Sequence, residues 1–229
     1  MDFKEKGIHP DYSKGSIDFL DCKIDLSERP FIPRPETEFW VKKSLNELKG
    51  IKKDKIYCLD LFSGSGCIGI SVLKKIENSC CDFGEVDKEF LKQIQKNLNG
   101  NKIGEKRRNI IETNVFSNIK NKYDCIFANP PYVAEDRISE VEDSVKENEP
   151  KGALFAGKNG MFFIRKFLEK FENYLKDDGV VFMEFDSGQK EEIEDLLKTK
   201  KGIKYEFWTD QFGKFRTVFI KKQAQNSPR

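Results

Sequence analysis

The chain has 229 residues, 38% of them hydrophobic, which is enough for one main domain with a single substantial core. Its 41 Lys and Arg residues nearly balance 39 Asp and Glu residues, and the net charge of +2 gives no strong field that would concentrate a polyanion. A nucleic-acid substrate is therefore neither excluded nor favoured by the charge.

Cysteine, histidine and apolar patterns narrow the class of protein further. Six cysteines show no CxxC spacing and His9 is the single histidine, so no metal site is predicted. The cysteines are interpreted as small buried residues of a protein kept in a reducing compartment. The N-terminus has no apolar signal core, and no segment approaches the roughly 18 unbroken apolar residues of a membrane span. The expected location is the cytoplasm, without a membrane.

Residues 1–35 are predicted to form a short N-terminal extension. Residues 16–26 alternate irregularly between apolar and polar side chains, which indicates a small strand pair. The segment 28–35 contains three prolines, which fix the backbone and exclude a helix there. A helix is expected to open at Glu36, where apolar residues begin to recur at helical spacing.

From residue 56 onward, apolar runs alternate with segments of helical period. Strands are predicted at 56–62, 81–87, 108–114, 123–129 and 179–186, helices at 67–76, 90–98, 161–175 and 193–197, and a closing hairpin at 203–208 and 215–220. Continuous apolar strands that alternate with helices are typical of a parallel sheet covered on both faces. The pattern predicts a doubly wound α/β domain over residues 36–221, followed by a tail, 222–229, that is expected to be disordered.

A glycine-rich segment lies between the predicted strand 56–62 and the predicted helix 67–76. Its Gly64, Gly66 and Gly69 have the spacing GxGxxG. Glycines allow a sharp turn and a close approach of a ligand to the backbone, and Gly69 can let the helix pack closely on the sheet. Asp87 follows 18 residues after Gly69, at the end of the next strand, where a carboxylate can accept hydrogen bonds from both ribose hydroxyls. The pair indicates an adenosine-containing cofactor, and the alternative is a simple tight turn.

Two cofactors, NAD and S-adenosylmethionine, both use this corner of such a sheet. Asp60, just before the loop, favours the second, because its charge fits poorly beside a pyrophosphate and well near the amine of a methionyl group.

The apolar strand 123–129 ends abruptly in Asn129, Pro130, Pro131 and Tyr132. Ligands of open α/β sheets bind at the carboxyl ends of the strands, so this segment is expected to open onto the same cleft as the glycine loop. The two prolines hold it extended. The side-chain oxygen of Asn129 and the carbonyl of Pro130 can form two fixed acceptors for the hydrogens of one planar NH2 group, with Tyr132 against its flat face.

Such acceptors suit methyl transfer to an amide or arylamine nitrogen, which is a poor nucleophile. They would orient the nitrogen and stabilise the positive charge that it gains, so no general base is obligatory. Asn129, Pro130 and Tyr132 are therefore the candidate catalytic residues. The alternative is that Asn-Pro is only a turn signal.

These motifs together resemble the class I S-adenosylmethionine-dependent methyltransferases, and more narrowly the release factor glutamine N5-methyltransferases, the PrmC/HemK family. The resemblance runs from about residue 15 to residue 221. Its most specific part is "FIPRPETE" (31–38). The other matching segments are "LDLFSGSGCIGI", "GEVD", "FANPPYV", "NEPKGALFAGKNGM" and "DQFGKFRTVFI".

The resemblance implies a Rossmann-like, seven-stranded, mostly parallel sheet with an antiparallel last strand. It implies methylation of the glutamine side chain in the Gly-Gly-Gln motif of a peptide chain release factor, with S-adenosylmethionine as donor and S-adenosylhomocysteine as product. The cofactor contacts that it implies are Phe62, Ser63, Gly64, Ser65, Gly66, Asp87, Asn114, Val115 and Asn129, beside the acid Asp60. The implied substrate contacts are Asn129, Pro130, Pro131 and Tyr132, together with Arg34, Glu36 and Thr37.

The chain departs from the family pattern at two places. Asn114 stands where the family usually carries Asp near the adenine, and its side-chain oxygen can still accept from the exocyclic amine. About thirty residues precede the segment 31–38, where the family usually has a helical domain that helps to recognise the release factor. Recognition through the catalytic domain alone, a recognition partner, or another target all stay open.

Other functions remain as alternatives at this point. N-methylation of an exocyclic amine of adenine or guanine in RNA or DNA would use the same kind of motif, but such enzymes usually need a basic groove or a recognition domain, so nucleic acid is not the expected partner. A non-catalytic S-adenosylmethionine-binding protein disagrees with the intact Asn129. An NAD-dependent dehydrogenase would need hydride-transfer chemistry that His9 is badly placed to supply.

Overall fold

The computed structural model describes residues 9–132 and 159–223. The strands are β1 (Ser16–Phe19), β2 (Cys22–Asp25), β3 (Ile56–Leu61), β4 (Ser79–Glu85), β5 (Arg108–Glu112), β6 (Tyr123–Ala128), β7 (Leu175–Glu184), β8 (Ile203–Thr209) and β9 (Phe215–Lys222). The α-helices are α1 (Pro10–Lys14), α2 (Pro35–Lys49), α3 (Cys67–Lys75), α4 (Lys88–Gly100), α7 (Phe162–Tyr174) and α8 (Lys190–Lys198). Two 3-10 turns are η1 (Glu105–Arg107) and η3 (Ser187–Gln189).

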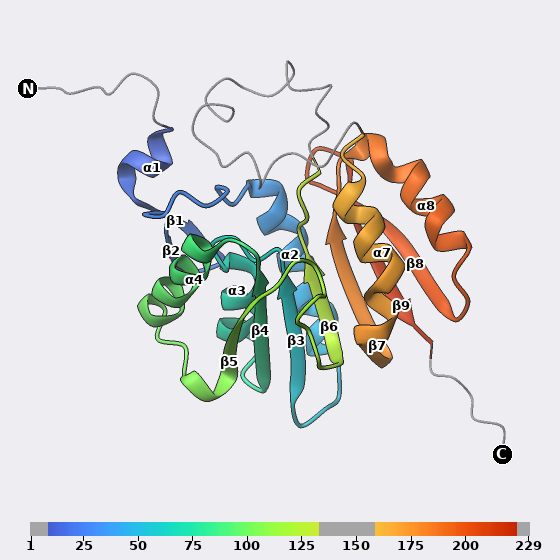
Figure 1. Cartoon of the computed structure of the whole chain (residues 1–229), viewed down its shortest axis with the longest axis horizontal. Helices are drawn as coiled ribbons and strands as arrows, with labels where there is room; N and C mark the ends of the chain where they lie inside the picture. Colours follow the sequence, from blue (N-terminus) through green and yellow to red (C-terminus); the bar gives the residue numbers. More distant parts are fainter. Residues whose placement is uncertain (1–8, 133–158, 224–229) are drawn as a thin grey trace, which may run out of the picture.

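Seven strands form one sheet with the order β5-β4-β3-β6-β7-β9-β8, and helices cover both of its faces (Figure 1). β9 is antiparallel to β7 and to β8, and the other neighbouring strands are parallel. The predicted doubly wound α/β fold with an antiparallel last strand is therefore confirmed. The strand order reverses between β3 and β6, and such a switch point is where open α/β sheets bind ligands.

The strands end slightly earlier than the apolar pattern predicts. β3 stops at Leu61 because Phe62 turns into the left-handed region (φ 61°), and β4 stops at Glu85 because Asp87 caps α4 by accepting from the Glu89 N–H at 2.8 Å. β5, β6 and β7 also end one or two residues before the predicted limits 114, 129 and 186. The extra residues leave the sheet at its carboxyl edge.

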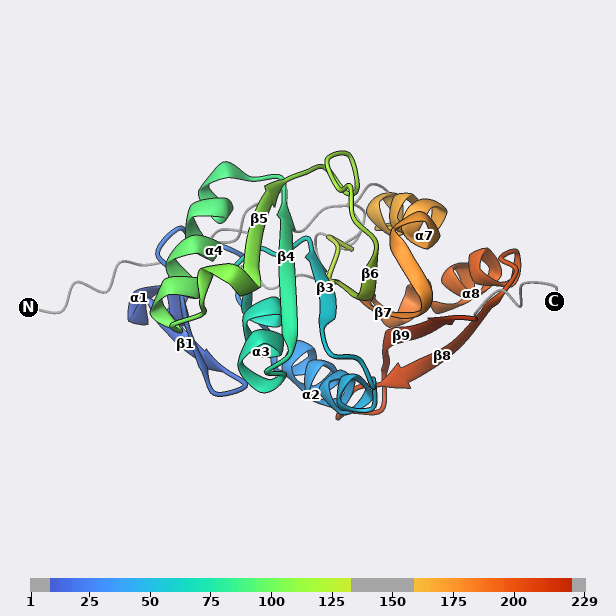
Figure 2. The same ribbon diagram turned by 90° about the horizontal axis from the view of Figure 1, so that it is seen from below.

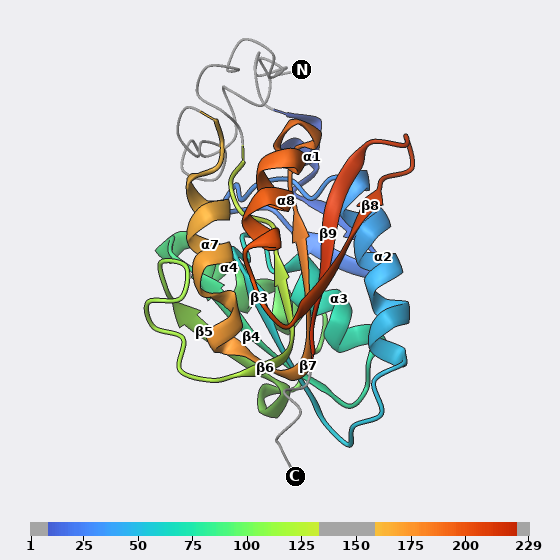
Figure 3. The ribbon, with the colours of Figure 1, turned by 90° about the vertical axis from the view of Figure 1, so that its right-hand side faces the viewer.

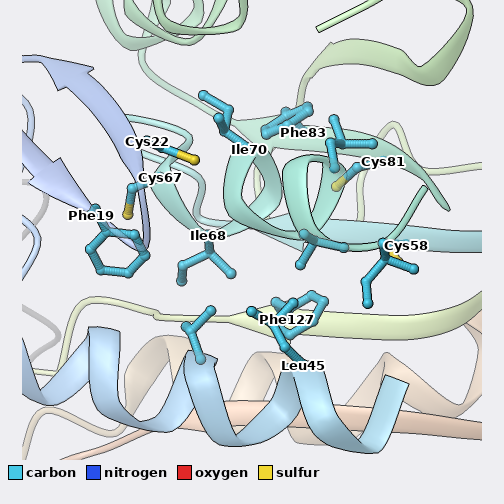
Figure 4. Close-up of a cluster of buried hydrophobic side chains, with 14 of the residues drawn as sticks. Phe19, Cys22, Leu45, Cys58, Cys67, Ile68, Ile70, Cys81, Phe83 and Phe127 are labelled. Atoms are coloured by element: carbon cyan, nitrogen blue, oxygen red, sulfur yellow. The ribbon is translucent and has the colours of Figure 1, made fainter. Parts of the chain in front are cut away.

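One face of the sheet is covered by α2, α3 and α4, and the hairpin of β1 and β2 packs against α3 and α4. Figure 4 shows Phe19 of the hairpin and Leu45 of α2 in the same buried cluster as the side chains of α3 and the sheet. The registers place Cys81, Cys58 and Cys125 side by side across β4, β3 and β6. All six cysteines are free thiols and all but Cys80 are buried, which confirms the interpretation of cysteine as a core residue.

The opposite face is covered by α7 and α8. Their inward residues, with Phe116 and Ile119 of the connection before β6, form a second buried cluster against the sheet. Figures 2 and 3 show α7 on the side of the sheet away from α2 and α3. The sheet is thus buried on both faces, which agrees with its continuous apolar strands.

The hairpin is attached to α4 by side-chain amides that pair with the backbone of β2. The Asp25 N–H donates to Asn97 Oδ1 (2.7 Å), and Asn97 Nδ2 donates back to the Asp25 carbonyl (3.1 Å). Asn101 makes the same pair with Lys23 at 3.2 and 2.8 Å. Four residues of a helix rise about 6 Å and two residues of a strand about 6.6 Å, so the two amides stay in step with the strand.

Two further contacts extend this attachment. Gln93 Oε1 accepts from the Glu28 N–H at 2.8 Å, one helical turn before Asn97. Asn97 Nδ2 also donates to the carbonyl of Ser65 at 2.9 Å, in the loop that follows β3. The N-terminal hairpin and the glycine loop are therefore held by the same side chain.

Among the described residues, no helix is long and apolar enough to cross a membrane. The same part of the chain contains no group of three or more potential metal ligands. Most of the segment "NEPKGALFAGKNGM" and all but the first two residues of the predicted tail lie outside the described residues.

Candidate active site

A cavity of about 220 Å³ lies at the carboxyl edge of the sheet, where β3, β4, β5 and β6 end. It is lined by predicted site residues: Thr37, Phe62, Ser63, Gly64, Ser65, Asp87, Asn114, Val115, Asn129, Pro130, Pro131 and Tyr132. The two motifs that the sequence placed in one cleft are thus brought together. Arg34, Glu36, Asp60 and Gly66 are not among the lining residues.

The glycine loop has the backbone that its sequence requires. Gly64 and Gly66 have φ of +53° and +78°, and Gly66 is the residue before α3. A Cβ on Gly69 would lie 2.4 Å from Cε1 of Phe83, so only glycine lets α3 lie this close to β4. This confirms the packing role expected for Gly69.

Two residues that line the cavity and are not glycine also have positive φ. Phe62 (φ 61°) and Val115 (φ 54°) follow β3 and β5, and a β-branched residue in this region is strained. Phe163 of α7 packs edge-on against Phe62, with ring centroids 5.8 Å apart. Strained backbone thus occurs at two positions on the rim of the cavity.

Glu85 is a site residue that the sequence analysis missed. Its carboxylate accepts from the backbone N–H groups of Gly64 (2.8 Å), Val86 (2.7 Å) and Asp87 (3.0 Å). Burial raises the pKa of Glu85, and the three donors act in the opposite direction. Glu85 therefore joins the glycine loop to the end of β4. An acidic residue in the middle of the predicted strand 81–87 was the available signal.

Asp60 lies behind the loop and is fully buried. Its Oδ2 accepts from the Gly69 N–H at 2.9 Å, while its Oδ1 has no hydrogen-bond partner among the described residues. Burial raises the pKa of Asp60 to about 8, and the charge of Glu85 adds to this. An orphaned acceptor of this kind suits a cationic donor, since a cation would favour the charged carboxylate.

The segment that follows β6, Asn129–Tyr132, is held at Tyr132. The Tyr132 hydroxyl donates to Glu184 Oε1 at 3.0 Å, and Gln189 Nε2 donates to the Tyr132 carbonyl at 3.0 Å. Gly160 has φ of +67°, and a Cβ there would lie 2.0 Å from the same carbonyl oxygen. Tyr132 is thus fixed through both its side chain and its backbone.

Glu184 connects this exit to the segment 31–38. Its Oε2 accepts from Thr37 Oγ1 (2.8 Å) and from the indole N–H of Trp40 (2.7 Å), both of α2. Burial raises the pKa of Glu184, and its hydrogen-bond donors oppose that shift. Sequence reasoning missed Glu184 and Trp40, and for Glu184 the only signal was one acidic residue within an apolar strand.

Arg34 and Glu36 are placed outside the cavity wall. The Arg34 guanidinium lies over the ring of Phe31, 5.0 Å from its centroid, and Phe31 and Pro33 line the cavity in their stead. The other lining residues that the sequence analysis did not select are Leu61, Cys67, Ile68, Gly84, Val86, Phe90 and Thr113.

Comparison with protein families identifies related sequences. Residues 32–166 match the family described as conserved hypothetical protein 95. The release factor glutamine methyltransferase of Lactococcus lactis is 33% identical over 213 residues, which cover 93% of this chain and 77% of the relative. Proteins of the same name from Thermodesulfovibrio yellowstonii and Streptococcus pneumoniae are 36% and 30% identical, covering 81% and 91% of this chain and 66% and 73% of the relatives.

Solved structures with a similar fold are also methyltransferases. The ribosomal protein L11 methylase of Lactobacillus delbrueckii has a TM-score of 0.64 at 16% identity, covering 87% of this chain and 84% of its own. SMU.776, a putative methyltransferase complexed with SAH, has a TM-score of 0.60 at 13% identity, covering 90% and 55%. At these identities the structures support the fold.

Proposed function

The chain belongs to the release factor glutamine methyltransferases, which are S-adenosylmethionine-dependent enzymes, and we propose that its substrate is the glutamine side chain in the Gly-Gly-Gln motif of a peptide chain release factor. One observation carries the proposal: Asn129 and Pro130 leave β6 into the same cavity that Gly64 and Asp87 line. An acceptor for an NH2 group and a place for an adenosyl cofactor therefore lie within one cleft.

The residues around the glycine loop fit S-adenosylmethionine. Asp87 is exposed at the end of β4 and would accept from the ribose hydroxyls, while the Asn114–Val115 corner would lie against the adenine. The orphaned Oδ1 of Asp60 fits a nearby ammonium group, which would lower the raised pKa of this carboxyl. When bound, the cofactor supplies an electrophilic methyl group on a sulfonium.

The acceptor residues would act by position. The Asn129 side-chain oxygen and the Pro130 carbonyl would each accept one hydrogen of the glutamine NH2, which aims the nitrogen at the methyl carbon. As the new C–N bond forms and the methyl–sulfur bond breaks, with S-adenosylhomocysteine as the neutral leaving group, the nitrogen would gain positive charge. The two oxygens would stabilise that charge before a proton is lost to solvent. The Tyr132 hydroxyl is already donated to Glu184, so the role left to Tyr132 is packing of its ring against the amide.

A methyl-transfer assay tests the proposal. Purified release factor and its Gly-Gly-Gln glutamine-to-alanine variant are incubated with the enzyme and labelled S-adenosylmethionine. Label is expected in the wild-type release factor alone, and Asn129→Ala enzyme is expected to transfer it about 10²–10³-fold more slowly. Equal labelling of both release factors would contradict the proposal, and label in added RNA or DNA would favour an exocyclic-amine substrate instead.

A further inference from the structure

Tyr132 is the last described residue before residues 133–158, and two side chains that lie 52 and 57 residues further along the chain hold it. Glu184 at the end of β7 accepts its hydroxyl, and Gln189 in η3 donates to its carbonyl. Gln189 Nε2 also donates to the Asn159 carbonyl at 3.2 Å, so it contacts the described residues on both sides of that segment. The position of Tyr132 is therefore set by tertiary contacts in addition to the local sequence.

Fixing Tyr132 also fixes Asn129. Only Pro130 and Pro131 separate the two residues, and prolines keep φ near −65°, so the connection is stiff. Asn129 is held at its other side by the end of β6 in the middle of the sheet. A shift of the Tyr132 ring would be passed through the prolines to the two proposed acceptor oxygens.

Both oxygens of the Glu184 carboxylate accept hydrogen bonds. Glu184 accepts from Tyr132 on one oxygen and from Thr37 and Trp40 on the other, and it is 1% exposed. Burying a carboxylate is costly, and apolar side chains of similar volume often stabilise a core as well or better. A buried acid at this edge of the sheet is therefore better explained by what it holds than by stability.

We propose that Glu184 is a positioning residue for methyl transfer, which holds the Asn129–Tyr132 segment through the Tyr132 hydroxyl. Thr37 and Trp40 orient the Glu184 carboxylate from α2, so the start of this helix acts on the acceptor geometry through Glu184. The inference rests on the proposed function of Asn129 and Pro130. It assigns no contact between Glu184 and the substrate or the cofactor.

A double-mutant cycle tests this role. Glu184→Gln keeps the shape but turns an NH2 group toward donors, and Tyr132→Phe removes only the hydroxyl. Each variant is expected to lower kcat for the release factor about 10- to 100-fold, with the Kd for S-adenosylmethionine within about twofold of wild type. Because both changes act through the contact between Tyr132 and residue 184, the double variant should be no slower than the slower single variant.

Thr217→Val is the matched control. Thr217 lies opposite Glu184 in the register of β7 and β9, is fully buried, and its hydroxyl has no partner among the described residues. It should keep wild-type kcat. The positioning role would be overturned if the fall in kcat of the double variant were the product of the two single falls. An unchanged kcat in Glu184→Gln, or a fall in kcat of the same size in Thr217→Val, would also overturn it.

A second readout needs no activity. Hydrogen exchange of a peptide covering residues 123–132 is expected to be faster in Glu184→Gln than in wild type and unchanged in Thr217→Val. If this holds while wild type fails to label the release factor, the proposed function alone is wrong. If the wild-type enzyme labels the release factor, but the peptide 123–132 exchanges at the same rate in Glu184→Gln and Thr217→Val, the positioning role alone is wrong.

Discussion

The cleft has a cofactor half, which includes residues 62–66 and Asp87, and an acceptor half, which includes residues 129–132. Different kinds of contact hold the two halves in shape. In the cofactor half, carboxylates accept from backbone N–H groups close in sequence: Gly69 to Asp60 spans 9 residues and Gly64 to Glu85 spans 21. In the acceptor half, side chains bond to side chains across the chain, and Thr37 lies 147 residues from Glu184. The cofactor half depends on the path of the backbone, and the acceptor half depends on a few polar side chains.

This difference separates the expected effects of substitution. Backbone donors remain when a side chain changes, so the cofactor half is sensitive mainly to glycine replacement and to loss of the ligand-binding acid. Side-chain donors and acceptors disappear when they are replaced, so the acceptor half can lose its geometry with little change in the sheet. Changes in the acceptor half should act on the rate of transfer, and changes in the cofactor half on affinity and folding.

Asn129→Ala should give the largest effect and sharpen this comparison. Removing one of two preorganised acceptors is expected to lower kcat by about 10²–10³-fold, as seen for single groups that stabilise developing charge. The thermal midpoint should stay near wild type because Asn129 follows the last residue of β6. Single-turnover kinetics and a melting curve measure both, and a comparable kcat in variant and wild type would refute the assigned role.

Asp87 variants test the cofactor half next. Asp87→Ala is expected to weaken S-adenosylmethionine binding by about 1.5–3 kcal/mol for each charge-assisted hydrogen bond lost, measured by calorimetry. Because Asp87 also caps α4, Asp87→Ala should lower stability, whereas Asp87→Ser can keep the cap. Asp87→Ser should therefore bind weakly and melt nearly as wild type. An unchanged Kd in both variants would show that the ribose lies elsewhere.

Gly69→Ala should act through packing. The new Cβ would meet Phe83 at 2.4 Å and Cys81 Sγ at 2.9 Å, so the free energy of unfolding is expected to fall by about 1–3 kcal/mol or more. Gly100→Ala is the matched control, since no atom lies within 4 Å of its Cβ. Urea titration of both compares them. Equal stability would mean that α3 can move away from β4 and that the backbone of this half is not rigid.

Asp60 should give an effect of a different kind, a change in the pH dependence of stability. The ordinary pKa of 3.8 is raised to about 8 in the folded chain, so unfolding releases a proton between these values. The free energy of unfolding should therefore fall as the pH rises from about 4 to about 8. Asp60→Asn is expected to reduce this decline in thermal midpoint, while the exposed Asp54→Asn should not. Parallel curves for Asp60→Asn and wild type would contradict the burial of a protonated carboxyl.

The sequence predicted the fold well because long apolar runs carry its signal. The predicted strands exceeded their observed ends at residues such as Phe62, Asp87 and Asn129, which continue the run but leave the sheet to line the cavity. The motif residues of the cofactor loop could be found since their contacts are local. The division of the chain at residue 35 and the roles of the individual site residues stay predictions.

The missed residues share one physical reason. The partners of Glu184 come from α2 and from the segment that follows β6, and no spacing in the sequence shows that these segments meet. An acid inside an apolar strand can be noticed, as Glu85 and Glu184 could have been, but its donors depend on the strand order. Arg34 and Glu36 were selected because they lie in a matching segment, although the helix turns Thr37 and Trp40 inward.

The amide pairs between α4 and β2 have a consequence for association of the protein. A two-stranded sheet exposes the backbone of its outer strands, and unpaired strand edges can recruit a strand of another molecule. Asn97 and Asn101 occupy both the N–H and the carbonyl of Asp25 and Lys23, which a neighbouring strand would otherwise use. The helix thus closes the hairpin edge as a third strand would, and protects it against aggregation through edge-to-edge pairing.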